Sequence, residues 1–403
     1  MVVCTYGGST RKGIFITERD GMAVVKLDSG YNIGVNPDSC TFFGHPAESP
    51  AKKTEVPQKK DLPVLSIVST GGTIASRIDY RTGSVTSQFD AGEILVAIPE
   101  LAKVAQYRTI PLATILSENM TPVIWQELAR AVYKEIKNGV TGVIITHGTD
   151  TMAYSAAALS FMIDTPVPVV FVGSQRSADR PSSDNAMNAV CAASAATCDL
   201  GEVAVVMHAT TNDDKCAIHR GTRVRKMHSS RRDAFRSIGI DPLGFVAYPS
   251  REVVLKSHAV RRGSRTLALH DKLEKHCGLV QFFPGMSPDL LKSYEGYKGL
   301  VLAGTGLGHV STTLIPSLQK LIKGGTVVVM TTQCMKGRVC DRVYDTGRDL
   351  LSAGVIEGGD MLPEVALVKL MWVLGNERDP EKAAEHMQAD LKGECNRRST
   401  HGL

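Results

Sequence analysis

A hydroxyl next to a carboxylate is the first pair of side chains in the sequence that could do chemistry. Thr149 and Asp150 lie in Thr146-His-Gly-Thr-Asp-Thr-Met152, between an apolar run and an alanine-rich run. A threonine hydroxyl becomes a nucleophile only when a neighbouring group takes its proton, and N–H groups at the start of a helix can hold the negative charge that develops. The alternative is structural, because aspartate often caps the first turn of a helix.

A second threonine bounded by glycine lies upstream. Thr73 belongs to Thr70-Gly-Gly-Thr-Ile-Ala75, where two glycines allow a sharp turn that can project the hydroxyl toward a ligand. Both threonines follow an apolar stretch. The sequence therefore predicts two reactive hydroxyls at the ends of two strands.

The flanking residues indicate how these side chains are positioned. Residues 64–69 and 143–146 are apolar and rich in β-branched types, which is typical of strands buried on both faces of a parallel sheet. The alanine-rich run 153–159 favours a helix. A strand, a glycine turn and a helix place Thr149 and Asp150 at the carboxyl edge of the sheet, where open α/β folds bind ligands. Alternating strands and helices after residue 64 predict a mostly parallel sheet.

The length of the chain predicts a protein of two or three domains. A chain of 403 residues is longer than a single hydrophobic core usually accommodates. The formal net charge of +5 permits an anionic partner without requiring one. The nine cysteines form an odd set without a CxxC pair, so we expect neither a zinc ribbon nor a disulfide framework. No apolar stretch suits an export signal or a membrane span, so we expect a cytoplasmic protein with no membrane contact.

The first 47 residues differ from the rest, since three short strand-like runs are separated by turn sequences such as Glu18-Arg-Asp-Gly21. A stretch rich in proline, lysine and glutamate follows and cannot form a core. The expected order is an N-terminal β-barrel module of the SH3-like kind (1–47), a linker (48–62), a catalytic domain (63–247), a second linker (248–276), a C-terminal α/β domain (277–392) and a tail (393–403).

The two threonine motifs together resemble the amidohydrolase family of bacterial-type L-asparaginases. The resemblance implies a two-domain body with parallel sheets and a threonine nucleophile that hydrolyses side-chain amides. It assigns Thr73 as the attacking hydroxyl, Tyr80 as the loop tyrosine that helps activate it, and Thr149, Asp150 and Lys226 as the second threonine with its carboxylate and lysine. Tyr80, judged alone, is a surface tyrosine in a polar loop. Spacing alone leaves Lys226 one cation among several arginines, as suited to a solvated or RNA-binding face.

The resemblance also implies substrate-binding residues. Ser117 and Glu118, in Ser117-Glu-Asn-Met120, align with the segment that holds the substrate's α-carboxylate and ammonium groups. Glu118 stands where many asparaginases have glutamine, and its carboxylate suits an α-ammonium group. The sequence has no ATP-binding loop of the form GxxxxGK[ST], and we expect no metal and no cofactor in this chain.

Three features narrow the resemblance to the D-subunit family of archaeal glutamyl-tRNA(Gln) amidotransferases. They are the N-terminal module with its linker, the segment Ser117-Glu-Asn-Met120, and the two long segments 173–185 and 223–235. That resemblance implies a glutaminase that supplies ammonia to a partner, the E subunit, which binds ATP and Mg²⁺ and contacts Glu-tRNA(Gln). It also implies a homodimer within a heterotetramer. A free-standing cytoplasmic L-asparaginase is one alternative, and a catalytically silent RNA-binding scaffold is another.

Overall fold

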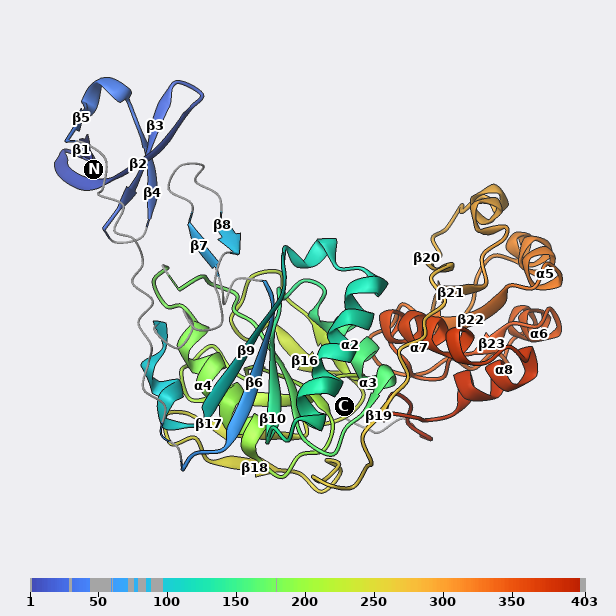
Figure 1. The fold of residues 1–403 in the computed structure, drawn as a ribbon. Coiled ribbons are helices and arrows are strands. Elements are labelled where there is room, and N and C mark those ends of the chain that lie inside the picture. Colours follow the sequence, from blue (N-terminus) through green and yellow to red (C-terminus); the bar gives the residue numbers. More distant parts are fainter. Residues whose placement is uncertain are drawn as a thin grey trace.

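The structure is a computed structural model that describes residues 2–28, 31–43, 59, 61–71, 76–78, 85–87, 97–178 and 180–398. For residues 76–78 and 85–87 only the backbone is described. Figure 1 shows a small sheet at the N-terminus, a central body built on a large sheet, and a second α/β body toward the C-terminus. Thr73 and Tyr80 lie outside the described residues.

The N-terminal module is a five-stranded antiparallel sheet in the order β4-β3-β2-β1-β5. Its strands are β1 (Val2–Tyr6), β2 (Ser9–Arg19), β3 (Met22–Leu27), β4 (Asn32–Val35) and β5 (Cys40–Phe42). Asp20 and Gly21 join β2 to β3 with φ angles of 53° and 73°, as a two-residue hairpin turn requires. A small core that includes Val2, Val25 and Val35 holds the module together, in agreement with the expected small β module.

The central body is an eight-stranded mixed sheet in the order β18-β17-β14-β13-β12-β10-β6-β9. The strands from β13 to β9 in that order are parallel, and β14, β17 and β18 are antiparallel to their neighbours. The strand bounds are β6 (Val64–Gly71), β9 (Gln106–Ile115), β10 (Gly142–Thr146), β12 (Val169–Val172), β13 (Val203–His208), β14 (Lys215–Arg220), β17 (Gly244–Ala247) and β18 (Val253–Leu255).

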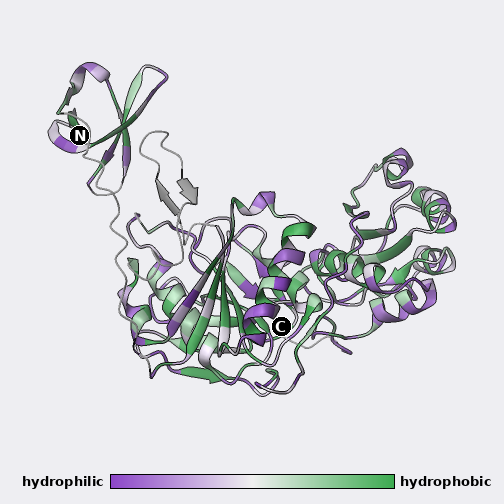
Figure 2. Ribbon diagram, in the orientation of Figure 1, coloured by the Kyte–Doolittle hydropathy of each residue, from purple (hydrophilic) through white to green (hydrophobic). Residues whose placement is uncertain are grey.

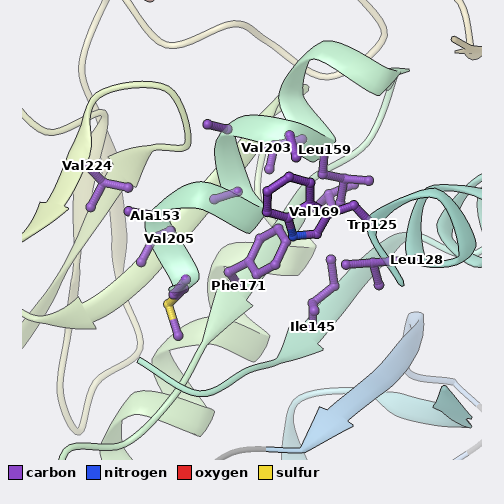
Figure 3. Packing of buried hydrophobic residues seen from close by; sticks show 14 of the residues in the cluster. Trp125, Leu128, Ile145, Ala153, Leu159, Val169, Phe171, Val203, Val205 and Val224 are labelled. Atoms are coloured by element: carbon purple, nitrogen blue, oxygen red, sulfur yellow. The ribbon is translucent and has the colours of Figure 1, made fainter. Parts of the chain in front are cut away.

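Helices cover both faces of this sheet, because its central strands are apolar on both faces. Val143 and Ile145 of β10 belong to the core shared with α2 (Pro122–Lys137) and α3 (Met152–Met162), whereas Ile144 belongs to the core shared with α4 (Asn185–Thr197). Figure 3 shows the first of these cores, in which Trp125, Phe171 and Ile145 gather beside Leu128 and Leu159. The β-branched run at 143–146 is thus a fully buried strand.

Three two-stranded sheets complete the central region. They are β7 (Ser76–Ile78) with β8 (Val85–Ser87), β11 (Ile163–Asp164) with β19 (Ala268–Leu269), and β15 (Val224–Lys226) with β16 (Phe235–Ser237). Strands β18 and β19 fall within residues 248–276, which the sequence suggested as a linker.

The C-terminal body is a parallel four-stranded sheet with helices on both faces. Its elements are β20 (Cys277–Gln281), β21 (Gly299–Gly304), β22 (Val327–Thr332), β23 (Ile356–Glu357), α5 (Ile315–Lys323), α6 (Asp345–Ser352), α7 (Pro363–Asn376) and α8 (Pro380–Gln388). Val365, Val368 and Met371 of α7 enter the core of the central body, so this helix joins the two bodies. Figure 2 shows hydrophobic strands in both sheets and hydrophilic stretches along the outer helices. No helix in the described part of the chain is long and apolar enough to span a membrane.

Candidate active site

The site is built where the parallel strands β6 and β10 end side by side. Their register pairs Ser69 with Thr146. The Thr70 hydroxyl donates to the Thr146 carbonyl at 2.9 Å, and the Thr146 hydroxyl donates to the Ser69 hydroxyl at 3.2 Å. These bonds fix the start of both predicted motifs at the carboxyl edge of the sheet.

The turn after β10 packs against Ser117. A Cβ atom on Gly148 would lie 2.7 Å from the Ser117 Cβ atom, closer than real contacts allow, so this position needs a glycine. The Thr151 hydroxyl donates to the Ser117 carbonyl at 2.7 Å. Ser117 is only 5% exposed. The turn and the substrate-binding segment that the sequence predicted therefore form one packed unit.

Lys226 contacts both members of the hydroxyl–carboxylate pair. Its Nζ atom donates to Thr149 Oγ1 at 2.9 Å and to Asp150 Oδ1 at 2.7 Å. Thr149 is buried and the Lys226 side chain is 13% exposed, while that of Asp150 is 69% exposed. Helix α3 begins after Thr151, whose side chain makes no capping hydrogen bond, and the Asp150 carboxylate pairs with Lys226 instead.

A short hairpin carries Lys226 to this position. β15 is paired only with β16, and Lys226 lies opposite Phe235. Val224 and Phe235, one on each strand, are fully buried in the core under α3. The hairpin is thus anchored by apolar packing, with its lysine at the edge of that packing.

The other cations near Lys226 are held by internal carboxylates. Each of the seven lysine and arginine side chains between residues 220 and 236 has an acidic partner within 4 Å. The pairs are Arg220 with Glu202, Arg223 with Asp360, Arg225 with Glu364, Lys226 with Asp150, Arg231 and Arg236 with Asp233, and Arg232 with Asp213. Within this set, Lys226 is the side chain that reaches Thr149 and Asp150. The alternative of a solvated or RNA-binding basic face is thereby weakened but not removed, because Arg231 and Arg236 are partly exposed and share the one carboxylate of Asp233.

The His147 side chain lies buried beneath the turn that follows β10. Its ring is fully buried beside Phe171, with the ring centroids 5.8 Å apart, and burial lowers its pKa to about 4. The Nδ1 atom lies 2.7 Å from the Gly148 carbonyl oxygen. Because a carbonyl oxygen only accepts, Nδ1 carries the proton and the ring is neutral near pH 7.

Asp184 organises the loop that follows β12 at the same edge. Its carboxylate is fully buried and accepts hydrogen bonds from the Ser174 hydroxyl at 2.8 Å, from Gln175 N at 3.0 Å and from Arg176 N at 2.9 Å. The Asn188 amide of α4 donates to it at 2.9 Å. The sequence pointed to residues 173–185 as a segment but not to Asp184 in particular. A single aspartate before a helix is usually interpreted as a helix N-cap.

The structure thus brings together four of the seven residues that the sequence predicted: Ser117, Thr149, Asp150 and Lys226. Glu118 follows Ser117 and is exposed. Thr73 and Tyr80 fall outside the described residues, and β6 ends at Gly71, shortly before Thr73 in the sequence. The described residues hold no cluster of three or more His, Cys, Asp or Glu side chains arranged to bind a metal ion.

Comparison with known proteins places this fold, with its threonine, lysine and carboxylate at the sheet edge, among the asparaginase-type amidohydrolases. Family models match the two bodies separately: "Asparaginase, N-terminal" covers residues 64–261 and "Glutaminase/Asparaginase C-terminal domain" covers residues 276–387. Two solved structures are similar as well. The L-asparaginase from Thermococcus kodakarensis is 34% identical with a TM-score of 0.73, and L-asparaginase I from Vibrio cholerae is 28% identical with a TM-score of 0.71; each match covers 83% of this chain and 99% of the other.

Curated relatives match almost the whole chain, including the N-terminal module. The D subunit of glutamyl-tRNA(Gln) amidotransferase from Methanosarcina mazei is 54% identical, and the match covers 96% of each chain. The protein of the same name from Archaeoglobus fulgidus is 55% identical, covering 96% of this chain and 92% of the other. The chain therefore belongs to the family of glutamyl-tRNA(Gln) amidotransferase D subunits, within the asparaginase-like amidohydrolases.

Proposed function

We propose that this chain is the glutaminase component of a tRNA-dependent amidotransferase, releasing ammonia from glutamine or asparagine for use by a partner protein. The observation that carries the proposal is the contact of Lys226 with both Thr149 and Asp150. The full-length similarity to D subunits supports the same assignment.

The proposed reaction has two steps. In the first, the Thr73 hydroxyl attacks the amide carbonyl, ammonia leaves, and the acyl group remains on the threonine as an ester. In the second, water attacks the ester, releases glutamate or aspartate, and restores the hydroxyl. Tyr80 assists the first step, as the family resemblance implies.

Proton transfer during both steps is assigned to a unit of three side chains: Thr149, Lys226 and Asp150. Lys226 donates to the Thr149 oxygen and so stabilises negative charge there, while Asp150 holds the ammonium in place. An ammonium group has no free electron pair, so Lys226 can take the Thr149 proton only as it passes one of its own to another group. A proton shared along this unit therefore fits the geometry better than a freely neutral lysine.

Substrate is held by the segment that packs on the turn. Ser117 lies against Gly148, one residue from Thr149, and this nearness supports its proposed role of binding the α-carboxylate of an amino-acid amide. Glu118 is exposed next to it and suits the α-ammonium group. A hydroxyl for the carboxylate and a carboxylate for the ammonium group would together favour a free amino acid as substrate.

The proposed assembly follows from the relationship to D subunits. The chain forms a homodimer and joins the E subunit in a heterotetramer. The E subunit binds ATP and Mg²⁺ and contacts Glu-tRNA(Gln), and this chain needs no cofactor of its own. A free-standing cytoplasmic L-asparaginase is the second candidate, favoured by the similarity to solved L-asparaginases over 83% of the chain.

Ammonia release from glutamine and from asparagine distinguishes the two candidates. The purified chain is assayed alone, with the co-expressed E subunit, and with the E subunit plus Glu-tRNA(Gln). Strong stimulation by both additions, with glutamine accepted, is the expected result. Full activity on asparagine that is indifferent to both additions would instead establish the free-standing enzyme. Thr73→Ala and Thr149→Ala variants then separate the steps, because only Thr149→Ala is expected to accumulate the acyl-enzyme.

A further inference from the structure

The hairpin that carries Lys226 is too short to fix that lysine by its own pairing. β15 has three residues and is paired only with β16. The apolar anchors Val224 and Phe235 fix its depth, and the Ser237 hydroxyl at the end of β16 lies 2.8 Å from the His219 ring on the neighbouring strand β14. A second group of polar contacts, at the base of the hairpin, restrains its position along the surface.

Those contacts come from the two residues immediately before β15. Thr222 and Arg223 are buried, with exposed fractions of 0% and 1%. The Thr222 hydroxyl donates to the Lys392 carbonyl at 3.0 Å, and Arg223 Nε donates to the Gly393 carbonyl at 3.0 Å. The strand that bears the lysine is thus tied to residues 390–398, which we call the C-terminal strap.

Asp360, in the loop before α7, completes the attachment. Its two carboxylate oxygens accept from the Arg223 guanidinium at 3.2 and 3.1 Å, and its carbonyl accepts a further bond at 3.2 Å. Asn396 of the strap donates its backbone N–H and its side-chain amide to the same carboxylate, at 2.8 and 2.9 Å. The Asn396 amide also reaches the Gly239 carbonyl, just beyond β16, at 2.9 Å. The start of β15 and the chain just after β16, which lie together at the base of the hairpin, are therefore held by one hydrogen-bond network.

The strap is itself firmly held. Glu394 and Lys369 of α7 form an ion pair at 2.6 Å in which both side chains are fully buried. Lys392 pairs with Asp164 of the central body. A displacement of the hairpin would break several buried bonds at once, so the network resists it.

We propose that Arg223 and Asp360 are positioning residues, which together with the C-terminal strap hold Lys226 in register with Thr149. The inference rests on the proposed role of Lys226 in amide hydrolysis. A misplacement of about 1 Å at a reacting group can cost on the order of 100-fold in rate, although the substrate still binds. Loosening this network is therefore expected to lower kcat while KM changes little.

The test compares Arg223→Lys and Asp360→Asn with Arg262→Lys in the full chain, bound to the E subunit where activity requires it. Arg262 is a matched control because its guanidinium also bonds backbone carbonyls, those of Thr141 and Cys198, away from the strap. Each variant is assayed for ammonia release from glutamine at the same interval below its own melting temperature. We expect kcat to fall roughly 10- to 100-fold in the first two variants, with KM changed less than about threefold, and both constants to be unchanged in the control.

A double-mutant cycle distinguishes positioning from general weakening. If Arg223 and Asp360 act through Lys226, adding Arg223→Lys or Asp360→Asn to Lys226→Ala will cause no further loss of activity. Equal additional losses in that background would overturn the proposal, as would unchanged kcat in Asp360→Asn, which preserves shape and is the variant less prone to misfold. Failure of the proposed function is distinct, since it would show as no amide hydrolysis in the unaltered chain or full activity in Lys226→Ala.

Discussion

Replacing Lys369 with methionine should destabilise the protein strongly. The Lys369 ammonium is fully buried, pairs with Glu394 at 2.6 Å and donates to the Met387 carbonyl at 3.1 Å. Lys369→Met would leave the buried Glu394 carboxylate with only the backbone N–H groups of Leu391 and Lys392 as donors. Removing one partner of a buried pair typically costs about 3–5 kcal/mol. For a cooperative unit of 150–250 residues, this corresponds to a fall in Tm of roughly 6–20 °C.

The double variant Lys369→Met/Glu394→Gln is the control. It removes the unpaired charge but keeps an amide oxygen for the two backbone donors, so it should recover more than half of the loss. Differential scanning calorimetry and chemical denaturation at pH 7 measure both variants. A loss below about 1 kcal/mol for Lys369→Met, or a double variant no more stable than the single one, would refute the reasoning.

The pH dependence of the unfolding free energy provides a second test of the Lys369–Glu394 pair. Burial acts to raise the pKa of Glu394, but Lys369 outweighs it and the pKa lies below the usual 4.5. A depressed folded-state pKa contributes stability that is present above pH 4.5 and is lost as the pH falls through the lower folded value. Without Lys369, the buried carboxyl takes up a proton at higher pH. The difference in stability between the unaltered protein and Lys369→Met should therefore be largest near pH 7 and shrink toward pH 4.

Three further predictions concern the site. Gly148→Ala places a methyl group against Ser117, so it should lower the unfolding free energy by about 1–3 kcal/mol and also lower activity. A fully active, equally stable variant would show that Ser117 moves aside freely. Lys226→Ala should lower kcat by about 10²- to 10⁴-fold, while Arg231→Ala, a neighbouring cation without contact to the site, should leave it nearly unchanged; equal losses in steady-state assays would contradict the assignment. Because the pKa of His147 is about 4 in the folded protein, its ring should remain neutral at pH 5.5 in NMR spectra. Its ordinary value is 6.5, so its contribution to stability should be lost as the pH falls from 6.5 to about 4, and a charged ring at pH 5.5 would contradict the burial.

Local sequence patterns predicted the elements that frame the site. The β-branched run at 143–146 is a buried strand, and the alanine-rich run 153–159 lies within helix α3. These predictions succeed because strand and helix periodicities are set by residues close together in the chain. Thr149 and Asp150 were recognisable for the same reason, since they stand at the junction of a strand and a helix.

Contacts between residues far apart in the sequence could not be predicted from local sequence patterns. Lys226 lies 77 positions from Thr149, and its spacing did not distinguish it from neighbouring arginines; only the family resemblance did. Arg223 and Asp360, 137 positions apart, carry no local signal of their contact. Each reads as an ordinary surface charge, and its burial becomes visible only when the chain is folded.

The internal pairing of the cations between residues 220 and 236 has a consequence for RNA binding. A protein gains affinity for a nucleic acid when its free cations replace counterions condensed on the phosphates, and the logarithm of the binding constant then falls with the logarithm of salt concentration. Cations already neutralised by carboxylates release few counterions. A tRNA docked on this segment would have to break those bridges first. Because Arg231 and Arg236 share the single carboxylate of Asp233, this segment keeps about one unpaired positive charge, and a steep salt dependence of tRNA binding by the assembled complex would report mainly on charges located elsewhere.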